Sequence, residues 1–484
     1  TISSILYQIE KNYVDSINID SLIESSAHQI LTNLDPHSIY MNKDDVSSSI
    51  EMMQGSFEGI GVEFSIHRDT IVIVNVIPNG PSEKKGLKSG ERIIFIEEEE
   101  VAGIGISNKD VISKLRGKRG TYVKVGVQSP QDTLVRFVSL KRDKIPLASL
   151  DVAYEINPQV GYIKLNRFSA TTFDEFKHEL KKLKRESSIN SLILDLRGNS
   201  GGYLDQAIKI LNEFFGEKEL LVYTKGNARR TEEYFANTFG DFQDGNLCIL
   251  IDEGSASASE IVAGAVQDHD RGLIIGERSF GKGLVQEQIE LQDGSLMRLT
   301  VSRYYTPSGR CIQKPYLENQ SEYFSEAYLR EDSQLVDTLQ QFNTMQGRVV
   351  YGGGGIMPDH IVKSNNDSLP TSLVYLYTSS FFNNLAFDYA DNKRRILSND
   401  FENFEITNND KKSILQEIEK WIIDELGNDQ NTSQIKLEIQ INSNNILERF
   451  SALIIRQLWG WAEMQIFLNQ NDEVITSSLS LLKD

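Results

Sequence analysis

The chain has 484 residues, a formal net charge of −19 and a sequence pI near 4.9. This acidic balance, without a large basic cluster, excludes a nucleic-acid-binding protein and disfavours an anionic membrane as a partner. No apolar run approaches the roughly 20 residues of a membrane span, and two cysteines with six scattered histidines lack the spacing of a disulfide framework or a metal site, so we expect no metal and no cofactor.

Within the first 142 residues the sequence pattern changes once, from helical to β-rich. Apolar residues recur at helical spacing over 1–50, which predicts helices, and LDPHS ends the segment because Pro36 forces the chain out of a helix. Residues 55–142 then contain short β-rich runs such as GVEFSI and TIVIVNVI, separated by Gly- and Pro-containing turns. One helix fits there, beginning at Ser107, with Asp110 placed as in a capping box. We expect a small β-rich module.

Strands and helices alternate from residue 145 to 315. GYIKL, SLILDL, NLCILI and GLIIG are typical of buried strands, and helical patterns lie between them. This alternation predicts a mostly parallel sheet covered by helices, an α/β core. After residue 366 the chain is rich in Asn, Ser and Gln and contains helical stretches. We expect a multidomain α/β protein with four parts: 1–54, 55–142, 143–365 and 366–484.

The stretch IDEGSASASEIVAG places three serines between an apolar strand and a helix. The free N–H groups of the helix's first turn can stabilise an oxyanion, and the small residues Ala256 and Ala258 leave room for a substrate backbone. A nucleophilic serine at this junction is one interpretation. Taken alone, the stretch favours the other, in which Ser255 or Ser257 is only a helix N-cap.

A nucleophilic serine needs a base, and no histidine lies in a comparable loop, since His269 would be at the far end of the helix. Lys282 stands between two glycines in SFGKGLVQ, and desolvation there would lower its pKa into the working range of a base. Gln286 falls on the same strand face, but four extended residues span roughly 13 Å at about 3.3 Å each, so contact needs a bend at Gly283. By itself, a lysine between glycines is more typical of a surface turn.

The turn RGNSGG follows the strand SLILDL directly. Such a turn exposes backbone N–H groups at the carboxyl edge of the sheet, where α/β proteins bind ligands. It could supply a second oxyanion donor, although alone this pattern is usually only a tight turn.

Together, these motifs resemble the carboxyl-terminal processing peptidases, or tail-specific proteases. The resemblance covers about 1–315 and 355–359, and it is carried in the family's order by LDPHS, GSFEGIGVEF, LILDLRGNSGG, GSASASEIVAGAVQD, ERSFGKGLVQ and GIMPD. It implies that 55–142 is a PDZ domain and that the catalytic core is related to the crotonase and Clp protease superfamily. Residues after 366 match no pattern of the family.

The resemblance also implies catalytic roles. Ser257 would be the nucleophile, Lys282 the general base and Gln286 the residue that orients it. The N–H of Ala258 would be one oxyanion donor, and Asp268 matches an acidic position near the dyad of some members. The second oxyanion donor would come from one of the last two glycines of the turn, Gly201 or Gly202.

In the PDZ module the resemblance implies a loop that binds the substrate's terminal carboxylate through backbone N–H groups. Its residues are Gly59, Ile60, Gly61 and Val62. The last side chain of the substrate would enter an apolar pocket lined by Ile60, Val62, Val111 and Leu115. Substrates ending in an apolar residue should therefore be preferred.

These features predict a serine endopeptidase with a Ser–Lys dyad that cuts proteins near C-termini recognised by the PDZ domain. A silent peptide-binding scaffold and an acyl-modifying enzyme are the rival functions. Expected partners are protein or peptide C-termini and no nucleic acid, with a homo-oligomer or an envelope adaptor protein as further candidates. Because the sequence begins with Thr1, we expect a processed or truncated chain, and the resemblance implies the bacterial periplasm or cell envelope.

Overall fold

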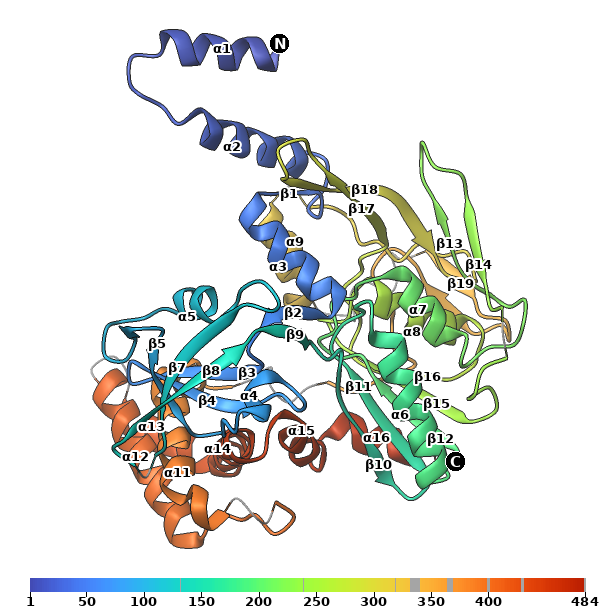
Figure 1. Cartoon of the computed structure of the whole chain (residues 1–484). Helices are drawn as coiled ribbons and strands as arrows, with labels where there is room; N and C mark the ends of the chain where they lie inside the picture. Colours follow the sequence, from blue (N-terminus) through green and yellow to red (C-terminus); the bar gives the residue numbers. More distant parts are fainter. Residues whose placement is uncertain are drawn as a thin grey trace. The chain divides into compact units, whose positions relative to one another are not determined.

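The computed structural model describes residues 1–130, 132–237, 239–317, 319–330, 340–363, 369–397, 401–427 and 431–482 (Figure 1). The chain divides into two compact units. The first unit consists of Thr1–Gly55, Ala148–Lys363 and Ser477–Asp484, and the second consists of Ser56–Leu147 and Ser364–Thr476. The expected boundary at 365/366 lies outside the described residues. In the part of the chain that the structure describes, helices of the length and apolarity that a membrane span requires are not found.

The first unit is built on a six-stranded sheet with the strand order β10-β11-β12-β15-β16-β21. All neighbours are parallel except β10 and β11, as the alternating pattern predicted. Strand β12 is buried along its whole length, which explains why SLILD is a continuous apolar run. The strands are β10 (Leu150–Asn157), β11 (Val160–Leu165), β12 (Ser191–Asp195), β15 (Asn246–Ile251), β16 (Leu273–Gly276) and β21 (His360–Ile361). Helices α6 (Thr172–Glu186), α7 (Leu204–Leu211) and α8 (Ala258–Asp268) pack on this sheet and share its core.

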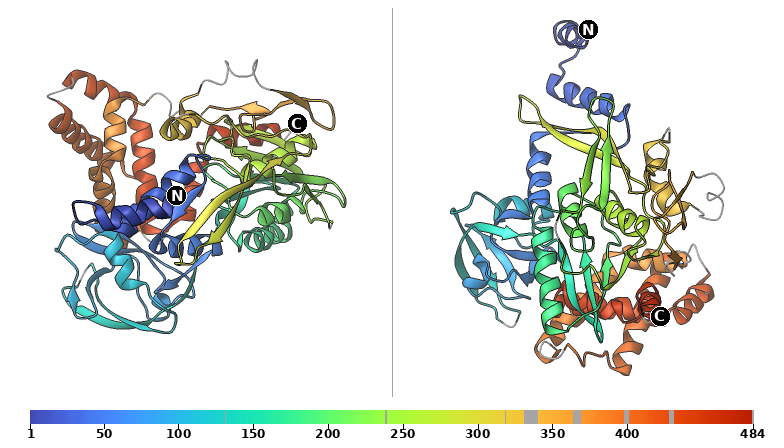
Figure 2. Two further views of the ribbon diagram at one scale, coloured as in Figure 1. Left: turned by 90° about the horizontal axis from the view of Figure 1, so that it is seen from above. Right: turned by 90° about the vertical axis from the view of Figure 1, so that its right-hand side faces the viewer.

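A second, antiparallel sheet of the same unit has the order β1-β18-β13-β14, with β17 paired to β18. The hairpin of β17 and β18 is long and projects from the rest of the sheet (Figure 2). Strand β1, which follows LDPHS, pairs with β18, so the end of the N-terminal segment lies in the sheet that contains the strand after Lys282. The strands are β1 (Ile39–Met41), β13 (Leu220–Lys225), β14 (Glu232–Phe235), β17 (Leu284–Glu290) and β18 (Leu296–Tyr305). The unit also contains α9 (Gln320–Leu329) and the pair β19 (Gln341–Asn343) and β20 (Val349–Tyr351).

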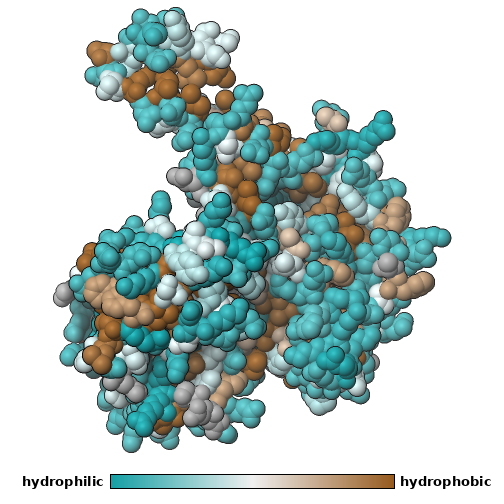
Figure 3. Space-filling model, in the orientation of Figure 1, coloured by the Kyte–Doolittle hydropathy of each residue, from teal (hydrophilic) through white to brown (hydrophobic). Residues whose placement is uncertain are grey.

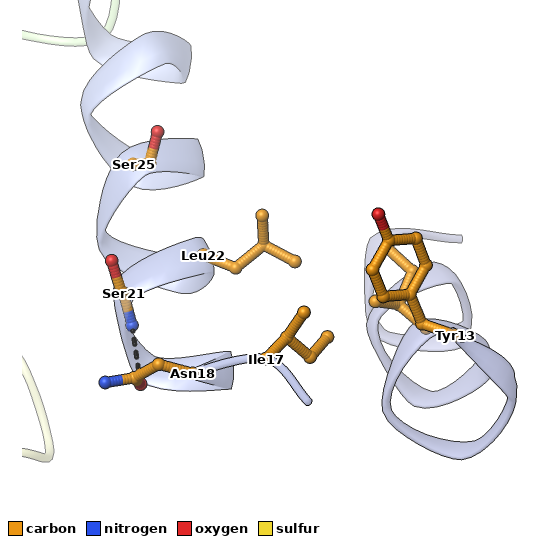
Figure 4. A pocket seen from close by; sticks show the side chains of 7 residues that line it. Tyr13, Ile17, Asn18, Ser21, Leu22 and Ser25 are labelled. Atoms are coloured by element: carbon orange, nitrogen blue, oxygen red, sulfur yellow. Dashed lines mark hydrogen bonds between the residues drawn. The ribbon is translucent and has the colours of Figure 1, made fainter. Parts of the chain in front are cut away.

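The expected N-terminal helices are α1 (Ile2–Asn12), α2 (Ile19–Thr32) and α3 (Lys43–Gln54). Helix α1 has no buried residue, and apolar side chains are visible on the surface of this segment (Figure 3). A shallow pocket of about 540 Å³ between α1 and α2 is lined by Tyr13, Ile17 and Leu22, beside the Asn18 side chain that caps α2 (Figure 4). These helices contribute almost nothing to a core.

The second unit contains the β-rich module. Its sheet has the order β3-β4-β5-β7-β8, with β6 paired to β5, and β2 pairs with β9. The predicted capping box is confirmed, because the side chains of Ser107 and Asp110 each accept the other's backbone N–H at the start of α5. The strands are β2 (Ser56–Gly59), β3 (Val62–His67), β4 (Thr70–Val76), β5 (Arg92–Ile96), β6 (Glu99–Glu100), β7 (Tyr122–Gln128), β8 (Val135–Lys141) and β9 (Asp143–Pro146), and the helices are α4 (Pro81–Lys84) and α5 (Asn108–Leu115).

The C-terminal helices form a bundle with an apolar core of its own. The bundle packs on the β3–β5 side of the module, where Arg92 binds Asp391 at 2.5 Å and lies over the ring of Phe387. A second ion pair joins Glu63 and Arg456 at 2.8 Å. The β-rich module and most of the C-terminal region thus belong to one compact unit. The helices that share this core are α10 (Thr371–Thr378), α11 (Ser380–Leu397), α12 (Asn408–Leu426), α13 (Thr432–Ile441) and α14 (Ser443–Leu458). They are followed by α15 (Trp461–Asn469) and α16 (Glu473–Leu481), and from Ser477 on the chain belongs to the first unit.

Candidate active site

The three serines of the turn between β15 and α8 have different environments. Ser255 and Ser259 are fully buried, and their hydroxyls donate to the backbone oxygens of Leu196 and Asn199, each at 2.8 Å. Ser259 therefore fastens the serine turn to the neighbouring RGNSGG turn, and Ser255 fastens it to the residue just before that turn. Ser257 is partly exposed at the N-cap of α8. Of the three, Ser257 is the one that a substrate can reach.

The backbone of Ser257 is strained. Its φ of 55° and ψ of −111° are rarely adopted by a residue with a side chain, at a cost of roughly 1–3 kcal/mol. Two buried groups hold this conformation: the Glu260 carboxylate accepts the Ser257 N–H at 2.8 Å, and the hydroxyl of Tyr304 donates to the Ser257 carbonyl at 3.2 Å. The sharp turn presents the serine side chain at the edge of the sheet.

Glu260 links the serine turn to the loop that carries Lys282. Its fully buried carboxylate accepts four hydrogen bonds, from the N–H groups of Ser257, Gly281 and Lys282 and from the Ser279 hydroxyl, at 2.6–2.8 Å. Burial raises the pKa of the Glu260 carboxyl, and these hydrogen bonds oppose the shift. The sequence analysis missed this residue, although a glutamate three positions after an N-cap serine is the signal of a capping box.

The Lys282 amine is buried and lies within hydrogen-bonding distance of one side-chain acceptor. Nζ donates to Gln286 Oε1 at 2.9 Å, and among the described residues no carboxylate forms an ion pair with it. Burial, assisted by the positive charge of Arg298, lowers the pKa of Lys282 to about 8, while Glu260 and Asp35 oppose the shift from further away. At pH 7, roughly a tenth of the amine is therefore neutral, far more than for an exposed lysine.

Lys282 and Gly283 precede β17, which begins at Leu284, so the lysine does not lie on the extended strand that carries Gln286. The pairing of β17 with β18 also shifts at a β-bulge, where Val285 faces Ser302, Gln286 faces Thr300 and the extra residue is Val301 of β18. A Cβ on Gly283 would lie 2.8 Å from the backbone nitrogen of Gln313, which favours glycine there.

The RGNSGG turn abuts the serine. A Cβ on Gly201 would lie 2.8 Å from the Ser257 Cβ and 2.9 Å from the Ala258 nitrogen. The Gly201 N–H already donates to Asn199 Oδ1 at 2.9 Å, whereas no hydrogen bond among the described residues uses the N–H of Gly202. Ala258 begins α8, so its N–H belongs to the free donors of the first turn. Ala258 and Gly202 are thus the available pair of donors.

Asp268 is not near the dyad. It ends α8, which at about 1.5 Å per residue places it roughly 15 Å from Ser257. Its carboxylate forms an ion pair with Arg310 at 2.7 Å, and both side chains are completely buried. Asp268 therefore stabilises the fold at the opposite end of the helix. His269 follows it there, as predicted, and its Nε2 lies 2.6 Å from the Leu220 oxygen.

In the second unit, the GIGV loop connects β2 to β3. Gly61 has a φ of +76°, which favours glycine, and β3 is an edge strand whose outer side has no strand partner among the described residues. Val62 packs against the module core, while Ile60, Val111 and Leu115 are almost wholly buried in it. The expected pocket residues therefore belong to one apolar cluster, in the module whose sheet ends at β3.

Comparisons with known proteins place both regions of the sequence in known families. Residues 159–322 match the model of Peptidase family S41, and residues 59–134 match that of the PDZ domain. The Carboxy-terminal-processing protease of Bartonella bacilliformis is 35% identical over 318 residues, which are 64% of this chain and 71% of that protein. Carboxy-terminal processing protease CtpB of Bacillus subtilis is 33% identical over 354 residues, 71% of this chain and 73% of that protein. Among solved structures, a photosystem II D1 C-terminal processing protease matches with 25% identity and a TM-score of 0.38, covering 76% of this chain and 89% of that chain.

Proposed function

Because the chain belongs to peptidase family S41, as a C-terminal processing serine protease with a PDZ domain, we propose that Ser257 is its nucleophile and Lys282 its general base. The observation that carries the proposal is the environment of Lys282. Its amine is buried, has a pKa of about 8 and binds an amide rather than a carboxylate. Glu260 ties the backbone of this lysine to that of Ser257.

The chemistry follows from these positions. The neutral amine of Lys282 takes the hydroxyl proton as Ser257 Oγ bonds to the carbonyl carbon of the scissile peptide. Charge develops on the carbonyl oxygen, where the N–H groups of Ala258 and Gly202 can stabilise it. The Lys282 ammonium then gives its proton to the leaving amine as the C–N bond breaks. Water hydrolyses the acyl-enzyme by the same proton transfers.

Labelling with a fluorophosphonate probe tests the dyad. The wild type should be labelled on Ser257 and should cleave an unstructured test protein, whereas Ser257→Ala and Lys282→Arg should do neither. Arginine fails because it keeps its proton at any usable pH. A chelator should leave the wild-type activity unchanged. Cleavage by Ser257→Ala at the wild-type rate would show that the nucleophile is wrong, and an unlabelled, inactive wild type would favour the silent scaffold.

We also propose that the PDZ domain binds the free C-terminus of the substrate. The tail would add as a strand to the open edge of β3, with its carboxylate at the loop Gly59–Val62. Calorimetry on the full chain carrying Ser257→Ala, which prevents cleavage, would compare a peptide ending in a free apolar residue with its C-terminal amide. The free acid should bind at least about tenfold more tightly because the amide lacks the charge that the backbone N–H groups hold. Equal binding of both peptides would contradict carboxylate recognition.

A place of action in the bacterial periplasm or cell envelope is a further proposal, supported by the resemblance to a family that commonly works there. Cell fractionation of the source organism with an antibody to this chain tests it, and recovery in the cytoplasmic fraction would overturn it. A second copy of the chain or an envelope adaptor protein as a partner stays a prediction, which light scattering and crosslinking of the purified protein would examine.

A further inference from the structure

A closed circuit of hydrogen bonds surrounds Lys282 and passes through three side chains that the mechanism does not use. Lys282 Nζ donates to Gln286 Oε1 at 2.9 Å, and Gln286 Nε2 donates to the backbone oxygen of His37 at 2.7 Å. The ring Nε2 of His37 lies 2.9 Å from the Tyr323 hydroxyl, which also accepts a hydrogen bond from Gln313 Nε2 at 3.0 Å. Gln313 Oε1 closes the circuit by accepting, at 2.9 Å, the backbone N–H of the residue after Lys282.

The direction of one bond in this circuit depends on the tautomer of His37. Gln313 donates an amide N–H to the Tyr323 oxygen, and we assign the tyrosine hydroxyl as the donor to His37 Nε2. In this assignment His37 is neutral, with Nε2 as an acceptor. Burial and the charge of Lys282 lower the pKa of His37 to about 3, Lys314 acts in the same direction, and Asp35 opposes them. The neutral imidazole therefore accepts a hydrogen bond from the Tyr323 hydroxyl throughout the working pH range.

The ring of His37 is also held by packing. It makes edge-on contacts with the rings of Phe280, Tyr323 and Phe324, at centroid distances of 6.1, 5.3 and 5.5 Å. Tyr323 is fully buried, and α9, which carries it, also donates from Gln320 Nε2 to the backbone next to His37 at 3.1 Å. Helix α9 thus holds the LDPHS loop against the Lys282 loop.

The backbone oxygen of His37 is fixed from the other side. Asp35 Oδ1 accepts the N–H groups of His37 and Ser38, both at 2.8 Å, in a tight turn. The Ser38 hydroxyl accepts the N–H of Thr300 at 3.1 Å, and β1 then pairs with β18. The carbonyl that receives the Gln286 amide is therefore anchored to the strand paired with β17.

We propose that His37, Tyr323 and Gln313 are positioning residues for the Lys282–Gln286 pair, so that the LDPHS segment of the N-terminal region is part of the peptidase site. The inference rests on the proposed role of Lys282 as the base. Each member of the circuit holds either the loop that carries Lys282 or the Gln286 amide that orients the Lys282 amine. Breaking one link lets the amine turn away from Ser257, which slows the chemical step and leaves substrate binding unchanged.

The variant Tyr323→Phe tests the circuit because it removes one hydroxyl and keeps the ring. We expect kcat, per active site titrated with a fluorophosphonate, to fall roughly 10- to 100-fold, with KM within about twofold of the wild type. Tyr377→Phe is the matched control. It loses a comparable hydroxyl bond, to Asn445 at 2.7 Å in the C-terminal helices, and should keep both constants.

Two substitutions of His37 distinguish the contribution of its ring nitrogen to turnover from the contribution of its ring packing. His37→Phe keeps a ring but removes the acceptor, and it should lose as much turnover as Tyr323→Phe. The double variant should be no slower than either single one, because both break the same bond. His37→Gln offers an acceptor oxygen near the position of Nε2 and should recover most of the turnover.

Turnover of Tyr323→Phe within twofold of the wild type, with only a lower melting temperature, would overturn the inference and leave Tyr323 as a core residue. Additive losses in the double variant would overturn it as well. The variant Lys282→Arg distinguishes this failure from that of the proposed function. An active Lys282→Arg enzyme refutes Lys282 as the base, whereas an inactive one beside a normal Tyr323→Phe enzyme refutes the positioning circuit alone.

Discussion

The two ends of helix α8 both bury a cation and a carboxylate, but they use them differently. At the C-terminal end, Asp268 and Arg310 form an ion pair at 2.7 Å. At the N-terminal end, the Glu260 carboxylate binds backbone N–H groups and a hydroxyl, while the amine of Lys282 binds the amide of Gln286. The same types of residue thus form a pair at one end and stay apart at the other.

This difference separates a structural site from a chemical one. A buried cation beside a carboxylate stays charged and keeps its partner, which serves the fold. A buried amine without a carboxylate neighbour loses its proton more easily and becomes a base, at a cost in stability. The strained backbone of Ser257 lies at the second end, where one carboxylate, that of Glu260, accepts the backbone N–H groups of both Ser257 and Lys282.

The largest contrast should come from exchanging the two cations. Lys282→Arg should lower kcat more than about a thousandfold, because arginine keeps its proton. Arg310→Lys should keep kcat per folded molecule within about threefold while lowering the melting temperature. Steady-state cleavage rates normalised to the folded fraction, with circular dichroism as the check of folding, measure both. Similar losses in the two variants would remove the distinction between the ends.

The next largest effect is on stability: replacing Lys282, which should abolish activity, should increase the free energy of unfolding. Its pKa is 10.5 when unfolded and about 8 in the fold, so the folded state binds fewer protons between these values. The cost is full below pH 8 and disappears above pH 10.5. Lys282→Met should therefore raise the free energy of unfolding by about 3 kcal/mol at pH 7 and by much less at pH 10.5. Urea denaturation at both pH values measures this, and destabilisation at pH 7 would contradict it.

The two carboxylates should also separate activity from stability. Glu260→Gln turns an amide N–H₂ toward four hydrogen-bond donors, and the shift of the two loops should lower kcat roughly 100-fold. Asp268→Asn should leave kcat nearly unchanged but lower the free energy of unfolding by about 3 kcal/mol, since it leaves the Arg310 charge unpaired. Parallel kinetics and urea denaturation of the two variants would test the contrast, and a normal kcat of Glu260→Gln would refute it.

The pH dependence should give the smallest effect. In the proposed mechanism the neutral amine is the active form, so kcat should rise about tenfold per pH unit well below pH 8 and level off above it. Arg310→Lys should show the same profile, because the distant ion pair does not titrate with the base. Initial rates in buffers of constant ionic strength from pH 6 to 10 provide the measurement. A flat profile across pH 8 would contradict neutral Lys282 as the base.

The sequence by itself determined the order of strands and helices in the core and the placement of the serine turn. Both depend on local patterns, since SLILD and NLCILI are continuous apolar runs of buried parallel strands, and a turn of small residues must follow them. Ser257, Lys282 and Gln286 were named from the family resemblance. The residues alone left Ser255 and Ser257 equally open as N-caps.

Only the tertiary structure decided which groups meet. The Gln286 amide meets the Lys282 amine at 2.9 Å, the Gly201 N–H donates to Asn199 while no hydrogen bond among the described residues uses that of Gly202, and Arg310 pairs with Asp268 at the far end of α8. His37 lies 249 residues from the glutamine that it holds. The physical reason is common to all of these cases. A buried polar group acts according to which donors, acceptors and charges remain unpaired around it, and distant segments of the chain set that balance.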